Sequence, residues 1–145
     1  MKKIIIMLAI TISSLAVFAG EENVNSRVLN AFSREFSGAK DVKWTTNETY
    51  SKASFVYNGQ YVYAFYQLDG ELMAMTRNIS SLDLPIKLQS GLKKGYEGYW
   101  ISDLFEISSS DGTSYYITME NANSKIVLKS TIDGSWKSFK KSAKK

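Results

Sequence analysis

Cysteine and histidine are both absent from the chain of 145 residues. Their absence excludes thiol nucleophiles, Ser-His catalytic triads and zinc or iron sites built on cysteine or histidine ligands. Disulfide bonds are excluded as well. Catalysis would have to use carboxylate, lysine, tyrosine or hydroxyl groups, and no motif in the chain indicates a particular reaction. We therefore predict a protein that is not an enzyme, with no catalytic residues, no metal site and no cofactor.

Paired carboxylates could still hydrolyse a glycosidic bond. Asp103 and Glu106 form such a pair in the sequence. Both lie in a segment typical of a β-strand, and their spacing of three places them on opposite faces of a sheet. Solvation of the strand explains these two residues more simply than catalysis does.

The N-terminus carries an apolar run that is too short to span a bilayer. Lys2 and Lys3 precede an uncharged stretch over residues 4–18, and the small residue Ala19 follows. A basic start, a short apolar centre and a small residue at the cleavage point are typical of a Sec-type signal peptide, here residues 1–19. A membrane anchor would need about 20 apolar residues. No cysteine lies near the cleavage point, so the protein is not a lipoprotein. We expect residues 20–145 to be one periplasmic or secreted domain with no integral membrane segment after cleavage.

Basic residues are concentrated at the C-terminus. Without Lys2 and Lys3 the net charge falls from +4 to +2, and residues 20–136 carry 11 basic against 14 acidic side chains. The short tail could touch anionic lipids or polyanions, but a solvated end is the simpler interpretation. Since the tail and not the sheet holds this charge, we predict no nucleic-acid partner. The tail lysines are Lys137, Lys140, Lys141, Lys144 and Lys145.

Two segments are predicted to be helical. Val28, Phe32 and Phe36 repeat at intervals of four within residues 23–39, with Asn23, Asn25 or Ser26 as the possible N-cap and Gly38 as the stop. The second helix begins near Pro85, the chain's one proline, which suits a first helical turn. Its stripe is Leu84, Leu88 and Leu92, and it is expected to end near Gly95.

Four strand-like segments follow each predicted helix, which indicates an internal repeat. Their β-branched and aromatic residues favour strands over residues 41–45, 50–57, 60–68, 71–76, 99–108, 114–120, 125–132 and 135–139. The sequences LDGEL (68–72) and IDGSW (132–136) occupy equivalent places, between the third and fourth strands. The pattern predicts an α+β fold of two αβ4 half-repeats, about 24–80 and 81–140, sharing one eight-stranded antiparallel sheet.

Four dipeptides are typical of tight hairpin turns, because both central residues of a type I′ turn need positive φ. Calcium ligation and a catalytic aspartate are the alternatives, but no stretch offers the ligand spacing of a calcium loop. The hairpin explains each glycine together with its flanking strands. The dipeptides are Asn58-Gly59, Asp69-Gly70, Asp111-Gly112 and Asp133-Gly134.

Two-residue turns would fix which side chains share a face. Tyr57 then pairs with Gln60 and Tyr66 with Met73. The face toward the helices holds Ala53, Phe55, Val62, Ala64, Tyr66, Leu68, Met73 and Met75. The opposite face holds Ser54, Val56, Tyr61, Tyr63, Phe65, Gln67, Leu72, Ala74 and Thr76, and Trp136 falls on this side if the repeat extends to it.

Three successive aromatics on one strand exceed what a solvated face requires, and such rings make good binding contacts. A covering layer or cross-strand pairing would explain them equally well. If the face is open, the predicted binding residues are Tyr61, Tyr63, Phe65, Gln67 and Trp136.

The segments FSREFSGAKDVKW (32–44), ASFVYNGQYVYAFYQLDGEL (53–72) and LPIKLQSGLKKGYEGY (84–99) resemble the PepSY-like, β-lactamase-inhibitor-like (BLIP-like) periplasmic proteins of Bacteroidota. The resemblance runs from about Val28 to Phe139 and rests mainly on core and turn residues, so it bears on fold more than on activity. It implies a curved sheet with two helices packed on one face and an open concave face. The namesake inhibitor grips a β-lactamase through such a face, but no inhibitor-specific motif is present here.

Together these observations predict a non-enzymatic binding protein. Its partner would be an unidentified extracytoplasmic protein or peptide, and its role could be inhibitor-like. The alternative is a carrier that stacks a glycan, a peptidoglycan fragment or an apolar molecule on the same aromatics.

Overall fold

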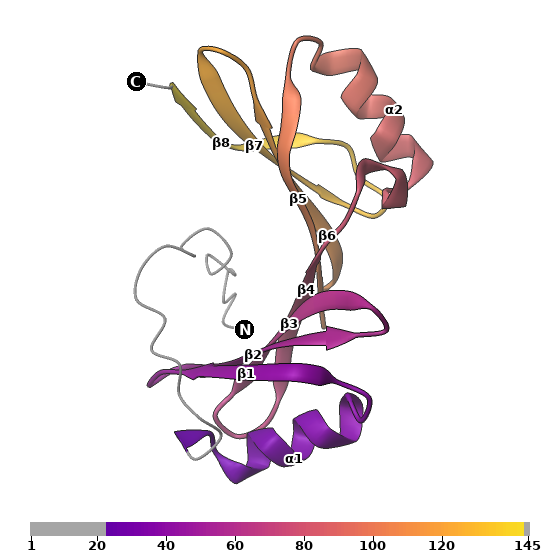
Figure 1. Ribbon diagram of the computed structural model, residues 1–145. Coiled ribbons are helices and arrows are strands. Elements are labelled where there is room, and N and C mark those ends of the chain that lie inside the picture. The colour runs from indigo at the N-terminus through magenta and orange to yellow at the C-terminus, as the bar shows by residue number, and fades with distance from the viewer. Residues whose placement is uncertain (1–22, 144–145) are drawn as a thin grey trace.

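The computed structural model describes residues 23–143, which form one open antiparallel sheet of eight strands and two α-helices (Figure 1). The predicted signal peptide and two of the tail lysines, Lys144 and Lys145, lie outside the described residues. The first half contains α1 (Ser26–Glu35), β1 (Lys40–Thr46), β2 (Tyr50–Tyr57), β3 (Gln60–Gln67) and β4 (Leu72–Asn78). The second contains a 3-10 turn (Ser81–Asp83), α2 (Ile86–Gly95), β5 (Trp100–Ser109), β6 (Gly112–Glu120), β7 (Ser124–Thr131) and β8 (Lys137–Ala143).

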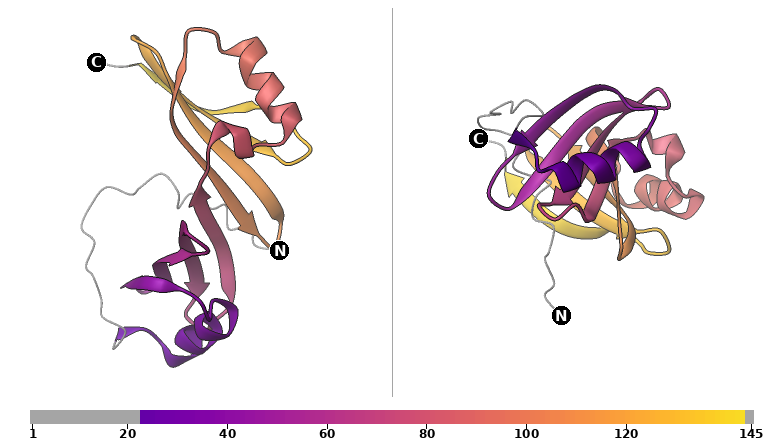
Figure 2. Two further views of the ribbon diagram at one scale, coloured as in Figure 1. Left: turned by 45° about the vertical axis from the view of Figure 1, so that its right-hand side comes forward. Right: turned by 90° about the horizontal axis from the view of Figure 1, so that it is seen from below.

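The strands follow one another across the sheet in chain order, from β1 to β8. A single row of cross-strand neighbours runs from Val62 through Arg77 and Glu106 to Tyr115. Val62 packs in the core beneath α1, and Tyr115 packs in the core beneath α2. Since neighbours in a row share a face, both helices cover the same side of the sheet. That side is the outer one of a curved sheet (Figures 1 and 2). The predicted α+β fold is confirmed.

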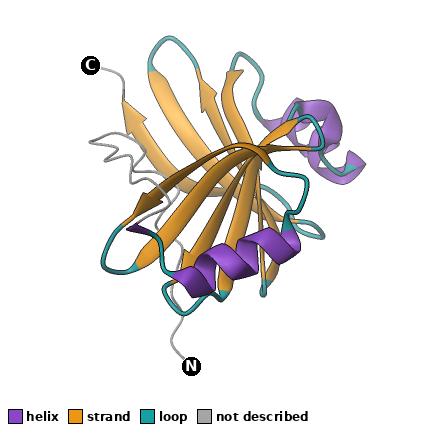
Figure 3. Ribbon diagram, turned by 60° about the horizontal axis from the view of Figure 1, so that its bottom comes forward, coloured by secondary structure: helices purple, strands orange, loops and turns teal. Residues whose placement is uncertain are grey.

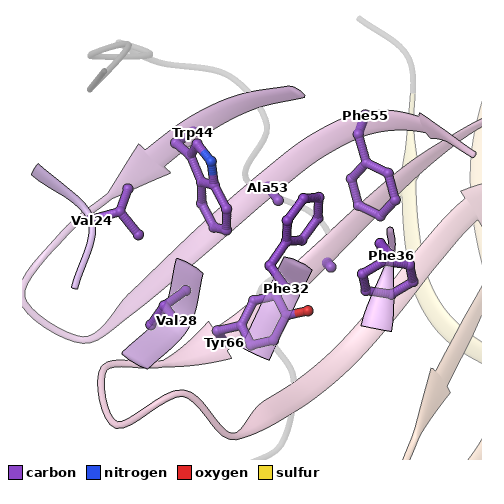
Figure 4. Packing of buried hydrophobic residues seen from close by; sticks show 9 residues of the cluster. Val24, Val28, Phe32, Phe36, Trp44, Ala53, Phe55 and Tyr66 are labelled. Atoms are coloured by element: carbon purple, nitrogen blue, oxygen red, sulfur yellow. The ribbon is translucent and has the colours of Figure 1, made fainter. Parts of the chain in front are cut away.

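The core beneath α1 is built from aromatic rings. Phe32 meets Phe55 and Trp44 with ring centroids 4.9 and 5.1 Å apart, and both contacts are edge-to-face. Tyr66 closes the cluster from β3 and is fully buried (Figure 4). Such ring pairs add to the stability that burial of their apolar area provides. The helix crosses the strands of its half (Figure 3), and its N-cap is Asn25, whose side chain accepts a hydrogen bond from the Arg27 N–H.

The core beneath α2 is mainly aliphatic. Leu84, Leu88 and Leu92 are all buried, as their spacing predicts. A capping box precedes the helix: Asp83 accepts hydrogen bonds from the N–H and hydroxyl of Ser80 at 2.8 Å each. These bonds hold the pKa of the exposed Asp83 carboxyl below its usual value.

The first predicted hairpin is confirmed. Asn58 and Gly59 have φ of +50° and +77°, as a type I′ turn requires. Tyr57 pairs with Gln60 and the register continues to Tyr50 opposite Gln67. The face assignments along β2 and β3 up to Gln67 therefore hold.

The second hairpin differs from the prediction. Gly70 alone has positive φ, and its N–H donates to the Gln67 carbonyl at 3.0 Å while the Gln67 N–H donates to the Glu71 carbonyl at 2.8 Å. The loop thus contains three residues, the form in which a type I turn is followed by a glycine bulge. Tyr66 consequently pairs with Leu72 and not Met73. Leu72 packs in the core, whereas Leu68 is exposed, so the predicted sides of these two residues are wrong.

The last two dipeptides are turns, but of another kind than predicted. Ser109 pairs with Gly112, which places Ser110 and Asp111 at the centre of the turn, and Gly112 follows with φ of +106°. Gly134 donates from its N–H to the Thr131 carbonyl at 3.0 Å and does not need positive φ. Aspartate before glycine suits a type I turn as well as a type I′ turn, and the central residues of both turns lack the positive φ that a type I′ turn requires.

The basic C-terminal segment is exposed to solvent, as predicted, but its described part forms a strand. Lys137, Lys140 and Lys141 belong to β8, which pairs with β7 as far as Ala143. Lysines on an edge strand discourage further pairing with other chains, which gives this charge a structural reason. No helix within residues 23–143 is long and apolar enough to cross a bilayer.

Candidate functional site

The three outward aromatics of β3 lie on the side of the sheet opposite the helices. Tyr61, Tyr63 and Phe65 alternate with buried Ala64 and Tyr66. Tyr61 is the most open of the three, with 48% of its surface exposed. Gln67 shares their side by alternation, and its amide donates to the Glu71 carboxylate at 3.0 Å. The structure therefore brings four of the five predicted binding residues together.

Contacts among these rings and a lysine order the first cluster. Tyr61 meets Tyr63 edge-to-face at 5.4 Å, and Phe65 lies 6.0 Å from the ring of Tyr50. The Lys52 ammonium sits over the Tyr63 ring, 5.6 Å from its centroid, a cation–π arrangement. Partial burial, together with the neighbouring Tyr61, raises the pKa of the Tyr63 hydroxyl.

A second aromatic cluster on the same side was not predicted. Phe105 and Tyr116 stack with centroids 5.3 Å apart and an interplanar angle of 6°, and Phe139 meets Tyr116 edge-to-face at 5.4 Å. The Lys129 ammonium lies 5.2 Å from the Tyr116 centroid. The strand alternation in FEIS and SYYITME could have indicated Phe105 and Tyr116, but the two-residue turn at Asp111-Gly112 left their register uncertain.

Small residues of β4 separate the two clusters. One row runs from Tyr63 through Thr76 to Ile107, and the next runs from Asn78 through Phe105 and Tyr116 to Lys129. Ala74, Ile107 and Tyr116 are buried as a third apolar cluster on this side of the sheet. We use the name aromatic face for Tyr61, Tyr63, Phe65, Phe105, Tyr116 and Phe139 together.

Trp136 does not lie on the aromatic face, so its predicted placement is wrong. Its indole N–H donates to the Leu88 carbonyl of α2 at 2.9 Å, and its ring packs against the core beneath that helix. Trp136 is the counterpart of Leu72 in the repeated segment, and Leu72 also packs on the helix side. Both residues point inward, because neither turn has the two-residue type I′ geometry. Another tryptophan, Trp100, is 51% exposed and lies opposite Glu120 in the register between β5 and β6.

Lysines flank the aromatic face, contrary to the prediction that positive charge gathers only in a tail. Alternation along the paired strands places seven lysines on this side, against three carboxylates, Glu71, Asp103 and Glu120. Lys125 forms an ion pair with Glu120 at 3.4 Å. The positive charge of the described sheet is therefore concentrated on the side that also carries the exposed rings. The seven are Lys40, Lys43, Lys52, Lys125, Lys129, Lys137 and Lys140.

Asp103 and Glu106 lie on opposite sides of the sheet, as their spacing predicts. Asp103 accepts from the Asn78 amide at 3.0 Å, whereas Glu106 binds the Arg77 guanidinium at 3.0 Å on the helix side. Over residues 23–143, no group of three or more carboxylates could hold a metal ion. Two shallow hollows lie at Arg27, Ala31 and Gly70 and at Asn78, Ser81 and Ile101, so neither is centred on the aromatic face.

The architecture defines a class: two αβ4 units share one curved sheet, with both helices on one side and the other side uncovered by helices. Several solved structures from Bacteroides share this fold. A BLIP-like protein of Bacteroides fragilis NCTC 9343 superposes with a TM-score of 0.71 at 14% identity over 83% of this chain and 86% of that one. A DUF2874 family protein of Bacteroides ovatus ATCC 8483 gives 0.72 at 17% identity over 83% and 87%.

A third similar structure is that of a protein of Bacteroides eggerthii DSM 20697 assigned to the periplasm, with a TM-score of 0.72 at 14% identity over 83% of this chain and 88% of that one. No family model and no curated protein matches the chain. At these identities the comparisons establish the fold, and the chain has the BLIP-like fold that its sequence suggested.

Proposed function

We propose that this protein is a non-enzymatic binding protein that engages another protein or a peptide through its aromatic face. The observation that carries the proposal is the grouping of two ring clusters on the side of the sheet without helices, with Tyr61 and Phe139 48% and 40% exposed. Tyrosine and phenylalanine offer large contact areas for little loss of rotamer entropy, and they are common at binding hot spots.

The proposed site of action is the periplasm or the exterior of the cell. The signal-like segment at residues 1–19 and the similar structure assigned to the periplasm support this location. An inhibitor-like role would fit the fold of the BLIP-like protein, though the aromatic face does not identify an enzyme target.

The carrier alternative has less support from the geometry. Small-ligand sites are usually concave pockets that bury most of the ligand. The hollows at Gly70 and at Ser81 are not centred on the aromatic face, and the rings there pack on one another. The face offers a broad surface, which suits a macromolecular partner.

Site-specific photo-crosslinking tests the proposal directly. A photoreactive phenylalanine analogue replaces Tyr61 on the aromatic face or, as a matched control, Leu82, which is 82% exposed on the helix side. The whole chain is expressed in its native host and irradiated. We expect a discrete protein adduct from position 61 and none of the same mass from position 82.

A second pair of variants connects the adduct to the rings. Tyr61→Ala with Phe139→Ala removes one exposed ring from each cluster, and Leu82→Ala with Ile86→Ala removes two exposed apolar side chains near α2. With the crosslinker at position 65, the first pair should abolish the adduct and the second should leave it. Equal adducts from both faces, or adducts of the chain with itself alone, would refute the proposal.

A further inference from the structure

We propose that the partner is an acidic protein or peptide, which the lysines of both edges of the sheet hold while the aromatic face packs against its apolar groups. This inference rests on the proposed function and adds the chemistry of the partner to it. The feature behind it is the arrangement of lysines around the two ring clusters.

The lysines form two groups at opposite edges of the sheet. Lys40, Lys43 and Lys52 lie on β1 and β2. The other group, Lys125, Lys129, Lys137 and Lys140, lies on β7 and β8. The central strands β3 to β6 carry the apolar and aromatic residues between them. A charged rim around an apolar centre is the usual arrangement of a protein interface.

This charge differs from that of the rest of the described chain. The seven lysines face three carboxylates on their own side, of which Glu120 is already paired with Lys125 and Glu71 accepts a hydrogen bond from Gln67. Over residues 23–143 the remaining surface has nine carboxylates against seven basic groups. The molecule is therefore positive on the aromatic face and negative elsewhere. Such segregation orients an acidic partner toward the aromatic face and raises the rate of encounter.

The separation of the two groups points to a macromolecule. Lys52 on β2 and Lys129 on β7 are five strand spacings apart, which is roughly 24 Å measured along the sheet at about 4.8 Å per strand. A small ligand cannot reach both groups. A folded domain can, because one side of a standard interface covers about 800 Å².

The ring contacts favour a protein over a nucleic acid. Bases bind to single-strand-binding surfaces by stacking on free ring faces. Here Tyr116 already stacks on Phe105 and has the Lys129 ammonium against its ring, and Lys52 lies over the ring of Tyr63. Asp103 and Glu120 on the same side would also repel phosphates. Acidic side chains paired with lysine, with apolar groups between them, satisfy the surface better.

Binding of defined polymers tests this chemistry. The probe is a fluorescent random copolymer of glutamate and tyrosine. The comparison probes are a copolymer of lysine and tyrosine, an oligodeoxythymidine and phosphatidylglycerol vesicles. We expect the exported protein to bind the acidic copolymer at low salt and to lose at least about tenfold in affinity near 0.5 M salt, since salt screens exposed charges.

Two charge-reversal variants with the same net charge make the test specific. Lys52→Glu with Lys129→Glu should weaken binding of the acidic copolymer at least about tenfold, whereas Lys93→Glu with Lys94→Glu at the end of α2 should change it by less than about threefold. Lys52→Gln with Lys129→Gln, checked for an unchanged melting temperature, separates the loss of charge from misfolding.

The outcomes separate this inference from the proposed function. We call Lys52→Glu with Lys129→Glu the rim variant. Loss of acidic-copolymer binding in the rim variant, without loss in the Lys93→Glu, Lys94→Glu variant, supports the inference. Stronger binding of oligodeoxythymidine or of vesicles, or no binding of any probe, overturns it. If the Tyr61 crosslinking adduct persists in the rim variant and in high salt, the aromatic face binds a partner but the partner is not held by charge. In that case the inference fails and the proposed function stands.

Discussion

Gly70 is the glycine whose replacement the structure tolerates least. Its φ of +98° is rare for residues with a side chain, and a Cβ there would lie 2.8 Å from the Arg27 carbonyl oxygen of α1. The first turn of the helix therefore approaches the β3–β4 loop too closely for any other residue. We expect Gly70→Ala to lower the free energy of unfolding by about 2–4 kcal/mol, combining backbone strain with a shift of the helix. Urea denaturation measures this loss.

Gly59 is the matched control for that measurement. It also has positive φ, at +77°, but no atom lies within 4 Å of the position that its Cβ would take. Gly59→Ala should thus cost only the backbone strain, about 1–2 kcal/mol. Equal losses at both positions would show that contact with α1 contributes nothing.

Tyr66 keeps a hydroxyl in the core without a regular hydrogen bond. The side chain is fully buried, and burial raises its pKa well above the ordinary value of 10.0, with a further contribution from the nearby Glu35 carboxylate. That carboxylate raises the pKa by its charge and proximity, but no hydrogen bond of good geometry joins it to the hydroxyl. Because an unpaired buried hydroxyl is costly, Tyr66→Phe should be neutral or stabilise by about 1 kcal/mol near pH 7.

The raised pKa of Tyr66 gives a pH dependence with a definite sign. Below pH 10 the phenol is protonated in both states, so its contribution is fully present. Above pH 10 only the unfolded chain releases this proton, and the free energy of unfolding falls by up to about 1.4 kcal/mol per pH unit. Comparing wild type and Tyr66→Phe by urea denaturation from pH 8 to 11 isolates this residue. A constant difference across that range would contradict the assignment.

At the scale of single elements, Trp136 fixes α2 to the strands. Its indole N–H bonds to the Leu88 carbonyl, and its ring lies where a Cβ on Gly91 would come within 3.3 Å. Trp136→Phe loses the hydrogen bond and part of the packing, so it should cost about 1–3 kcal/mol. Trp100→Phe, at a position 51% exposed, is the control and should cost less than about 1 kcal/mol. Thermal unfolding followed by circular dichroism distinguishes the two.

The hairpins show which parts of the strand register could be predicted from sequence alone. Residues Tyr50 to Gln67 were predicted in the right register because Asn58-Gly59 has one favoured geometry between strands. Asp69-Gly70 is compatible with a two-residue turn and with a three-residue loop, and a difference of one residue moves a side chain to the other face. Leu72 and Trp136 were therefore placed on the wrong side. The loop at Gly70 also packs closely against α1, a contact that no local pattern contains.

Across the whole molecule, the sheet brings together lysines that are far apart in the chain. Lys52 and Lys129 each lie over a tyrosine on one face, although 76 positions separate them in sequence. The aromatic pattern of β3 could be predicted from alternation within one strand. The second cluster and the lysine rims depend on register across several strands, and each uncertain turn adds an error to that register.

The interface between β4 and β5, where the two halves of the sheet meet, is expected to determine whether the molecule unfolds as one unit. The cores beneath α1 and α2 are separate, and each belongs to a half of about 60 residues, a size that is marginal alone. On the helix side Arg77 joins Glu106 at 3.0 Å, and on the other side Ala74 packs with Ile107. The ion pair is only partly buried and stays accessible to solvent, so burial of Ile107 should provide most of the coupling.

Ile107→Ala tests this coupling. We expect a loss of about 2–4 kcal/mol, with the two halves no longer unfolding together. Two single-tryptophan proteins report on the halves separately, one retaining Trp44 beneath α1 and the other Trp136 beneath α2. Within each protein, tryptophan fluorescence of the one half and far-ultraviolet circular dichroism of the whole chain should give the same urea midpoint when Ile107 is retained. With Ile107→Ala, the midpoints should separate, because each half then depends on its own core. Coincident midpoints despite the full loss of stability would mean that backbone pairing of β4 with β5 alone couples the two halves.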